Sequence, residues 1–186
     1  MTAVAPDLVP THRLWRRLVA ASVVAGIVMT ALLALEARWL PALLMVIAAG
    51  AAALAPILRL PGAFVAMIAV ASVVNGASIA WNWYAAWPPF DEWAHLLNHV
   101  VLVAPSMIWL HRARFVTARA GSGPFVLAAA AYGLALALAW EVIESYIWVF
   151  PFWDTVSDIG LGVVGSALGG WWAGRAIRLA GSAPAP

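Results

Sequence analysis

Three short clusters of acidic and histidine residues carry the side chains most capable of chemistry in this sequence. In the segment FDEWAHLLNH, Asp91, His95 and His99 follow one another at intervals of four, so one face of a helix carries all three. In WEVIES, Glu141 and Glu144 are three residues apart and project from the same side of a helix. Two carboxylates this close in a low dielectric need a cation or a shared proton.

The third cluster, WDTVSD, places Asp154 and Asp158 four residues apart, just before an apolar run. We expect Asp154 to cap the N-terminus of the following helix and Asp158 to point inward from its first turn. Asp91 and its neighbour Glu92 also have a simpler interpretation, as solvated charges of a loop.

The composition indicates that membrane-spanning helices position these clusters. Of the 186 residues, 65% are hydrophobic and 10% are charged, and the mean hydropathy is +0.94. Soluble domains contain about 25% charged residues, so a soluble globular enzyme is not expected. The absence of cysteine excludes disulfides and thiolate metal sites. Six apolar runs are long enough to span a bilayer: residues 18–35, 39–58, 60–81, 93–110, 125–148 and 159–177.

The predicted fold is all-α: a polytopic integral membrane protein, a bundle of about six transmembrane helices. Runs this rich in Ala, Leu and Val satisfy their backbone groups in lipid as helices rather than as barrel strands. We expect a single transmembrane domain over residues 18–179, an N-terminal tail over 1–17 and a C-terminal tail over 180–186.

Arginine placement predicts the orientation. All ten basic residues are arginine, and with the N-terminus inside the cell nine of them lie on the cytoplasmic side and only Arg38 outside. This predicts a multi-pass protein of the inner (cytoplasmic) membrane with both termini in the cytoplasm. The basic N-terminus resembles the start of a signal peptide but lacks a convincing cleavage site, so we expect a retained first helix. Because membrane orientation already accounts for the arginines, we do not expect a nucleic-acid partner.

In this orientation the last three predicted spans present the three clusters at the same outer end, where they can converge on one outward-facing pocket; the sequence does not fix the order of the helices and so does not determine whether they meet. We expect a divalent metal ion to be bound there by His95, Glu141, Glu144 and Asp158. We expect Asp91, His99 and Asp154 to orient these ligands or to replace them. Imidazole together with carboxylates suits Zn, Mn or Fe better than Mg. The simpler interpretation of His99 is a neutral, hydrogen-bonded interior histidine.

The residues of these clusters resemble a known family. The order FDxxxH, WExxE and WDTxxD, leading into a glycine-rich last helix, is similar to the YjdF-like bacterial inner-membrane proteins, a domain of unknown function, and distantly to the VanZ-like membrane proteins. The resemblance covers roughly residues 88–174. It implies that the matching residues form one site and implies no particular activity. The matching positions are Asp91, His95, Glu141, Glu144, Asp154 and Asp158.

Three functions remain open from the sequence. The first is metal binding, with metal-assisted hydrolysis of a lipid or envelope precursor as its enzymatic form and Glu141 and Glu144 as candidate catalytic residues. The second is a proton-coupled transporter in which the glutamate pair and the histidines relay protons. The third is a structural or accessory membrane subunit. Whether the protein is an enzyme is left undecided.

Tryptophan and glycine indicate how the helices meet lipid and each other. Seven tryptophans gather at the predicted outer boundary, as expected for an interfacial belt, and membrane lipids are the expected partners. Gly165, Ser166 and Gly169 give the last helix a face of small residues. This face predicts internal packing of the bundle or, alternatively, a homodimer.

Overall fold

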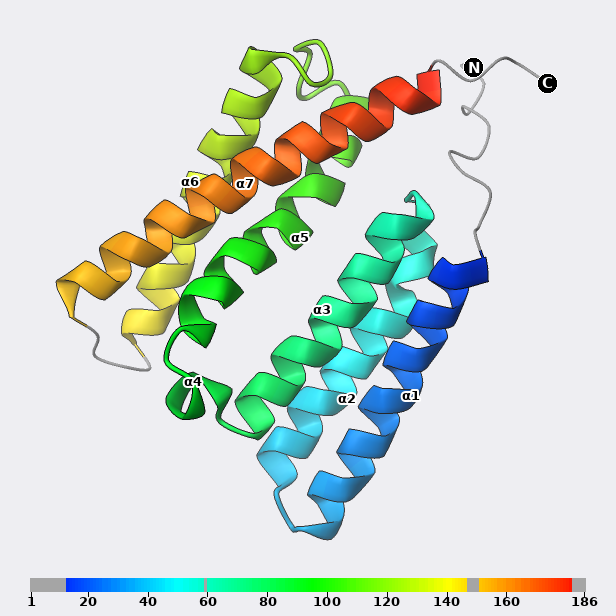
Figure 1. The fold of residues 1–186 in the computed structure, drawn as a ribbon, viewed down its shortest axis with the longest axis vertical. Helices are drawn as coiled ribbons and strands as arrows, with labels where there is room; N and C mark the ends of the chain where they lie inside the picture. The colour runs from blue at the N-terminus through cyan, green and yellow to red at the C-terminus, as the bar shows by residue number, and fades with distance from the viewer. Residues whose placement is uncertain (1–12, 59, 147–150, 182–186) are drawn as a thin grey trace. The chain divides into compact units, whose positions relative to one another are not determined.

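The computed structural model describes residues 13–58, 60–146 and 151–181, and all the regular structure in these ranges is helical (Figure 1). The predicted all-α fold is confirmed. Parts of the predicted tails (1–12 and 182–186), together with Arg59 and Trp148, lie outside the described residues. The described chain divides into two compact units, and the division falls between Pro88 and Pro89.

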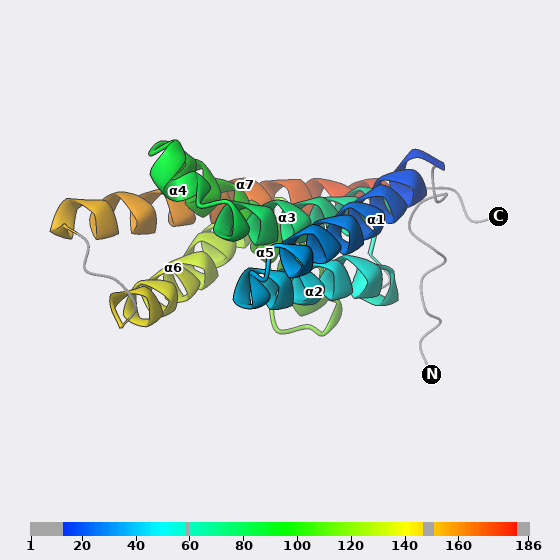
Figure 2. The same cartoon turned by 90° about the horizontal axis from the view of Figure 1, so that it is seen from below.

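The first unit is built from three long helices and two short ones. They are α1 (Arg13–Leu35), α2 (Trp39–Leu54), the 3₁₀ helix η1 (Ala55–Leu58), α3 (Gly62–Ala80) and α4 (Trp83–Ala86). α1 and α2 lie side by side with only three residues between them, and both pack against α3 (Figure 2). Leu33, Met45 and Ala69 are completely buried where these three helices meet. Arg38, just before α2, donates a hydrogen bond to the carbonyl of Ala80 at the end of α3.

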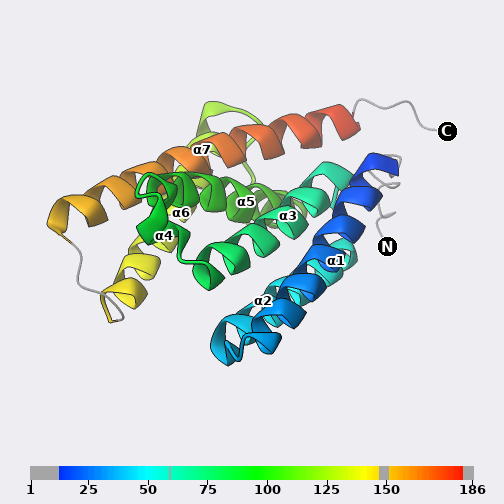
Figure 3. The same ribbon diagram turned by 60° about the horizontal axis from the view of Figure 1, so that its bottom comes forward.

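The second unit is a three-helix arrangement in which α7 lies along both other helices. Its elements are α5 (Phe90–Arg112), α6 (Gly123–Ser145) and α7 (Phe152–Gly181). α7 packs against α5 and against α6, as Figure 3 shows.

Glycines on α7 make this close packing possible. A Cβ at Gly165 would collide with the Leu96 carbonyl oxygen of α5, and one at Gly170 would collide with Ala129 of α6. The small-residue face is therefore used for packing within the second unit, the first of the two alternatives. The homodimer stays a prediction.

Five of the long helices are long and apolar enough to cross a membrane: α1, α2 with η1, α3, α5 and α6. α7 is not among them, because its many glycines and Arg175 lower its hydropathy although it has 30 residues. The sixth span, the position of the termini and the single transmembrane domain stay predictions.

The apolar surface of these helices fits a lipid environment. Leu35, Ile57 and Leu127 are each at least 70% exposed, and such side chains are stable at a helix surface that faces lipid. The described tryptophans of the predicted outer belt are all exposed, which an interfacial position requires. They are Trp39, Trp81, Trp83, Trp87, Trp93 and Trp153.

Candidate metal centre

The first turns of α5 carry the first cluster. Asp91, His95 and His99 lie on one face of this helix, and the two histidines are buried. α5 begins at Phe90, so Asp91 and Glu92 belong to its first turn, where a negative charge interacts favourably with the helix dipole. The interpretation of these two residues as loop charges is therefore wrong. Asp91 is half-buried, whereas Glu92 is exposed to solvent.

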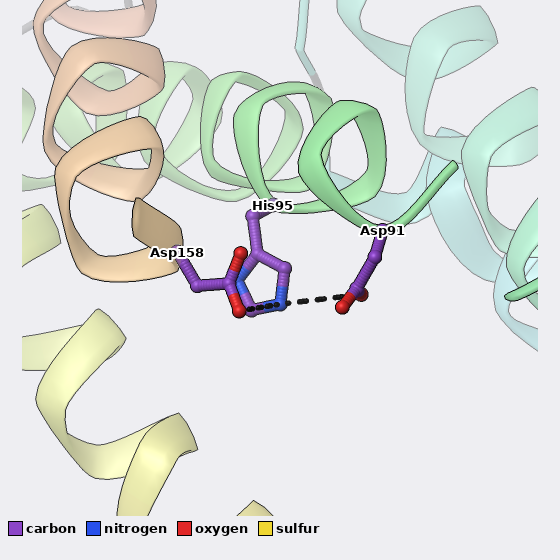
Figure 4. Close-up of side chains that lie close together, drawn as sticks. All are labelled: Asp91, His95 and Asp158. Carbon is purple, nitrogen blue, oxygen red and sulfur yellow. Dashed lines mark ion pairs between the residues drawn. The ribbon is translucent and has the colours of Figure 1, made fainter. Parts of the chain in front are cut away.

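His95 is the residue on which the clusters converge. Its Nε2 lies 3.6 Å from Oδ1 of Asp91 on α5 and 3.7 Å from Oδ2 of Asp158 on α7 (Figure 4). Both separations exceed the usual N–H···O distance of about 2.7–3.2 Å. The two carboxylates face His95 closely, yet each keeps its lone pairs available for a further partner. The sequence spacing predicts the Asp91–His95 contact, and the tertiary structure adds Asp158.

α6 supplies the glutamate pair to the same histidine. One ligand atom from each of His95, Glu141 and Glu144 lies within 4.8 Å of the others, and the same holds for Asp91, His95 and Asp158. Three equally spaced ligand atoms with metal–ligand bonds of about 2.0–2.2 Å lie at most about 3.8 Å apart. Either triad could therefore hold an ion after its ligand atoms move together by up to about 1 Å, which side-chain rotation can supply.

Two carboxylate oxygens of this cluster lack partners. Oε1 of Glu141 and Oε2 of Glu144 are buried and accept no hydrogen bond, and Glu144 is only 9% exposed. Among the described residues, no ion pair joins an arginine to any of these carboxylates. Burying an unpartnered carboxylate is costly, so the arrangement calls for a cation or protons.

Asp154 does not cap α7, contrary to the expectation from its sequence position. The helix begins at Phe152, and the backbone N–H of Asp154 donates to the carbonyl of Pro151 at 3.0 Å. Asp154 thus lies inside the first turn, partly exposed, and its charge faces the positive end of the helix dipole. It is not part of either triad of potential ligands in the described chain. Asp158, one turn further, does point inward and is 3% exposed.

His99 lies one turn deeper than His95 and has a different environment. Its Nδ1 is 3.0 Å from the hydroxyl of Ser166, and that hydroxyl donates to the carbonyl of Gly162 at 2.6 Å. Because the hydroxyl proton is engaged with Gly162, Nδ1 of His99 must donate to Ser166. His99 is therefore a buried histidine whose Nδ1 is hydrogen-bonded, which agrees with its simpler interpretation as a hydrogen-bonded interior residue.

Ser166 and Gly162 are the neighbours of the site that sequence reasoning did not assign to it. A Cβ at Gly162 would lie 2.8 Å from Nε2 of His99, so a glycine is needed for the imidazole to fit under α7. Their spacing of four on a glycine-rich helix was the available signal, but the same spacing is typical of simple helix packing.

Two serines beside the cluster do not form a nucleophile. The hydroxyl of Ser145 donates to the carbonyl of Val142, and that of Ser157 donates to the carbonyl of Asp154. Each hydroxyl is bonded within its own helix, and no histidine contact activates either serine in the described structure.

No family model, curated protein or solved structure matches this chain. The resemblance to the YjdF-like and VanZ-like proteins therefore stays a prediction, and the geometry of the cluster carries the functional argument.

Proposed function

We propose that this protein is a multi-pass membrane protein that binds a divalent metal ion through His95, Glu141, Glu144 and Asp158. The observation that carries the proposal is the pair of buried, unpartnered oxygens of Glu141 and Glu144 beside the His95 imidazole. A divalent ion would neutralise two of the buried carboxylates and give both oxygens a ligand bond.

The donor set indicates which ions fit. One imidazole nitrogen with carboxylate oxygens suits Zn, Mn or Fe, whereas Mg is usually held by carboxylates and water alone. Asp91 faces the same Nε2 of His95 as Asp158 does, so it would be an additional or alternative ligand; a group that orients a metal-bound imidazole accepts from its other ring nitrogen. His99 supports the adjacent turn of α5 through Ser166 and stays outside the ligand set.

The proposed chemistry is metal-assisted hydrolysis. An ion with one open position polarises a carbonyl or phosphoryl oxygen or activates water. Each glutamate would bind the ion through one carboxylate oxygen, and the second oxygen of Glu141 or Glu144 would accept the proton of that water. The site belongs to a unit with apolar helices α5 and α6, so a lipid or lipid-linked envelope precursor is the proposed substrate class.

We also propose the membrane topology. α7 completes six spans, both termini lie in the cytoplasm and the metal site faces outward in the inner membrane. The support is the distribution of charge: in the second unit the arginines occupy one end of the helices and the acidic residues the other. A reporter fused to either terminus would give the opposite accessibility if the topology were inverted.

The test of metal binding is the metal content of the full chain, purified in detergent and analysed by elemental mass spectrometry. We expect about one equivalent of Zn, Mn or Fe per chain in the wild type and its loss in the E141Q/E144Q double variant. Glu92→Gln is the matched control, because Glu92 is also acidic and lies at the end of α5 that carries His95, but its side chain is exposed. Failure of the wild type to retain any of the three metals after reloading would refute the proposal.

Proton sharing is the second candidate, and the position of His95 between two carboxylates favours it. A proton on the imidazole would interact with Asp91 and Asp158 together, and the glutamate pair would share another. A flux driven by a pH gradient in proteoliposomes, lost in His95→Gln and without bound metal, would select this function over metal binding.

A further inference from the structure

A second polar feature lies in the same unit, where the loop between α5 and α6 meets the C-terminal part of α7. An open concavity of about 290 Å³ is found there, at the low end of the size range of small-ligand sites. It is lined by Arg119, Ala120, Gly121, Ser122 and Arg178. α6 separates it from the metal site, since Glu141 and Glu144 occupy the opposite end of that helix.

Two glycines bring α7 against this loop. Residues 119–122 form a turn in which the Ser122 N–H donates to the Arg119 carbonyl at 3.0 Å, and Gly121 has a φ of +71° at its third position. A type II turn requires glycine or asparagine at that position. A Cβ on Gly121 would collide with the guanidinium of Arg178, and one on Gly174 would collide with the backbone of Gly121. Glycine at position 121 thus leaves room for the guanidinium of Arg178, and glycine at position 174 lets α7 approach the backbone of the loop.

Arg178 is held in place by the loop that it contacts. Its Nη1 donates to the carbonyl of Ala120 at 2.8 Å, which anchors one nitrogen of the guanidinium to the loop. A guanidinium has five N–H donors, so four remain after this bond. Arg119 is the second arginine among the residues that line the same concavity. Two guanidinium groups, one of them anchored, are suited to the oxygens of a phosphate group.

The two arginines that line the concavity, Arg119 and Arg178, form no ion pair with a described residue. The described part of the second unit has five arginines at this end: Arg112, Arg114, Arg119, Arg175 and Arg178. Its acidic residues lie near the opposite ends of the helices. The two arginines that line the concavity therefore present positive charge to an external anion.

We propose that this concavity is a phosphate-binding site, which accepts the phosphate of an anionic phospholipid headgroup or of a soluble phosphate compound. Its position at the ends of helices that are apolar enough to span a membrane favours the lipid headgroup. The site is independent of the proposed metal centre and uses none of its residues.

The experiment uses the full chain in two arms. In the first, nanodiscs of phosphatidylcholine with phosphatidylglycerol are used, and native mass spectrometry counts the lipids that the protein retains. In the second, inorganic phosphate is titrated into lipid-depleted protein in detergent. Arg119→Gln and Arg178→Gln are compared with Arg175→Gln, an exposed arginine of α7 that does not line the concavity.

We expect preferential retention of phosphatidylglycerol, weakened about fivefold by Arg119→Gln and by Arg178→Gln and unchanged in Arg175→Gln. Saturable binding of inorganic phosphate with the same response to the variants would instead identify a soluble phosphate compound. Binding in neither arm, or equal weakening in Arg175→Gln, would overturn the proposal. If loss of the Ala120 bond unfolds Arg178→Gln, Arg119→Gln decides the outcome, because no described hydrogen bond of the fold depends on that guanidinium.

Discussion

Replacement of Gly165 by alanine is expected to loosen the packing of α7 on α5. The new Cβ would collide with the carbonyl oxygen of Leu96 and would lie 3.1 Å from the Cβ of His99. Carbon–oxygen contacts normally begin at about 3.3 Å. The obstacle is a backbone atom within a helix, so a change of rotamer cannot remove the collision and the two helices must separate.

The size of the effect follows from a comparison with Gly160 on the same helix, where a Cβ would meet nothing within 4 Å. Alanine raises the helix propensity at either position by about 1 kcal/mol, so this contribution cancels between the two variants. What remains is the cost of overpacking, about 1–3 kcal/mol. We therefore expect Gly165→Ala to be about 1–3 kcal/mol less stable than Gly160→Ala.

The same separation should impair the proposed metal site, because Nε2 of His95 and Oδ2 of Asp158 face each other at 3.7 Å across α5 and α7. In a formed metal site the bond lengths lie within about 0.2 Å of their standard values, so ligands held further apart bind the ion less tightly. The assays are unfolding of the purified protein by sodium dodecyl sulfate, followed by circular dichroism, and elemental mass spectrometry. Equal stability of the two alanine variants would refute the packing argument. Lower stability of Gly165→Ala with unchanged metal content would refute only its link to the site.

Three further predictions concern other contacts. Ser166→Ala leaves the buried Nδ1 of His99 without a partner and should lower the free energy of unfolding by about 1–3 kcal/mol in the same unfolding assay. Arg38→Gln removes the hydrogen bond to the Ala80 carbonyl and should lower the free energy of unfolding by about 1–2 kcal/mol. Glu36→Gln breaks only an exposed ion pair and should change it by less than about 0.5 kcal/mol. Equal effects of the two variants would contradict a stabilising role of the Arg38–Ala80 bond. Lowering the pH should release the bound metal, because imidazole and carboxylate ligands must be deprotonated, and retention of metal in acid during dialysis would argue against these ligands.

Much of the secondary structure is determined by the sequence itself. Long apolar runs in lipid must satisfy their own backbone groups, so helices follow from composition and run length. The spacing of Asp91, His95 and His99 then places them on one face of α5, as the structure confirms. Helix ends depend on local hydrogen bonds that the sequence does not specify. Asp154 is a favoured capping residue, yet α7 starts earlier because the Pro151 carbonyl accepts the first hydrogen bonds.

Only the tertiary structure decides which helices meet. In a chain this apolar, side chains that face lipid and side chains that face another helix are equally hydrophobic, so hydropathy does not identify the neighbours of a helix. The choice is made by steric fit: Gly165 admits the backbone of α5, and Gly162 admits the His99 imidazole. That fit brings Asp158 to His95, although the two residues are 63 positions apart in the sequence. The residues of the candidate site can be read from the sequence, but their convergence depends on glycines whose role appears only when the helices are packed.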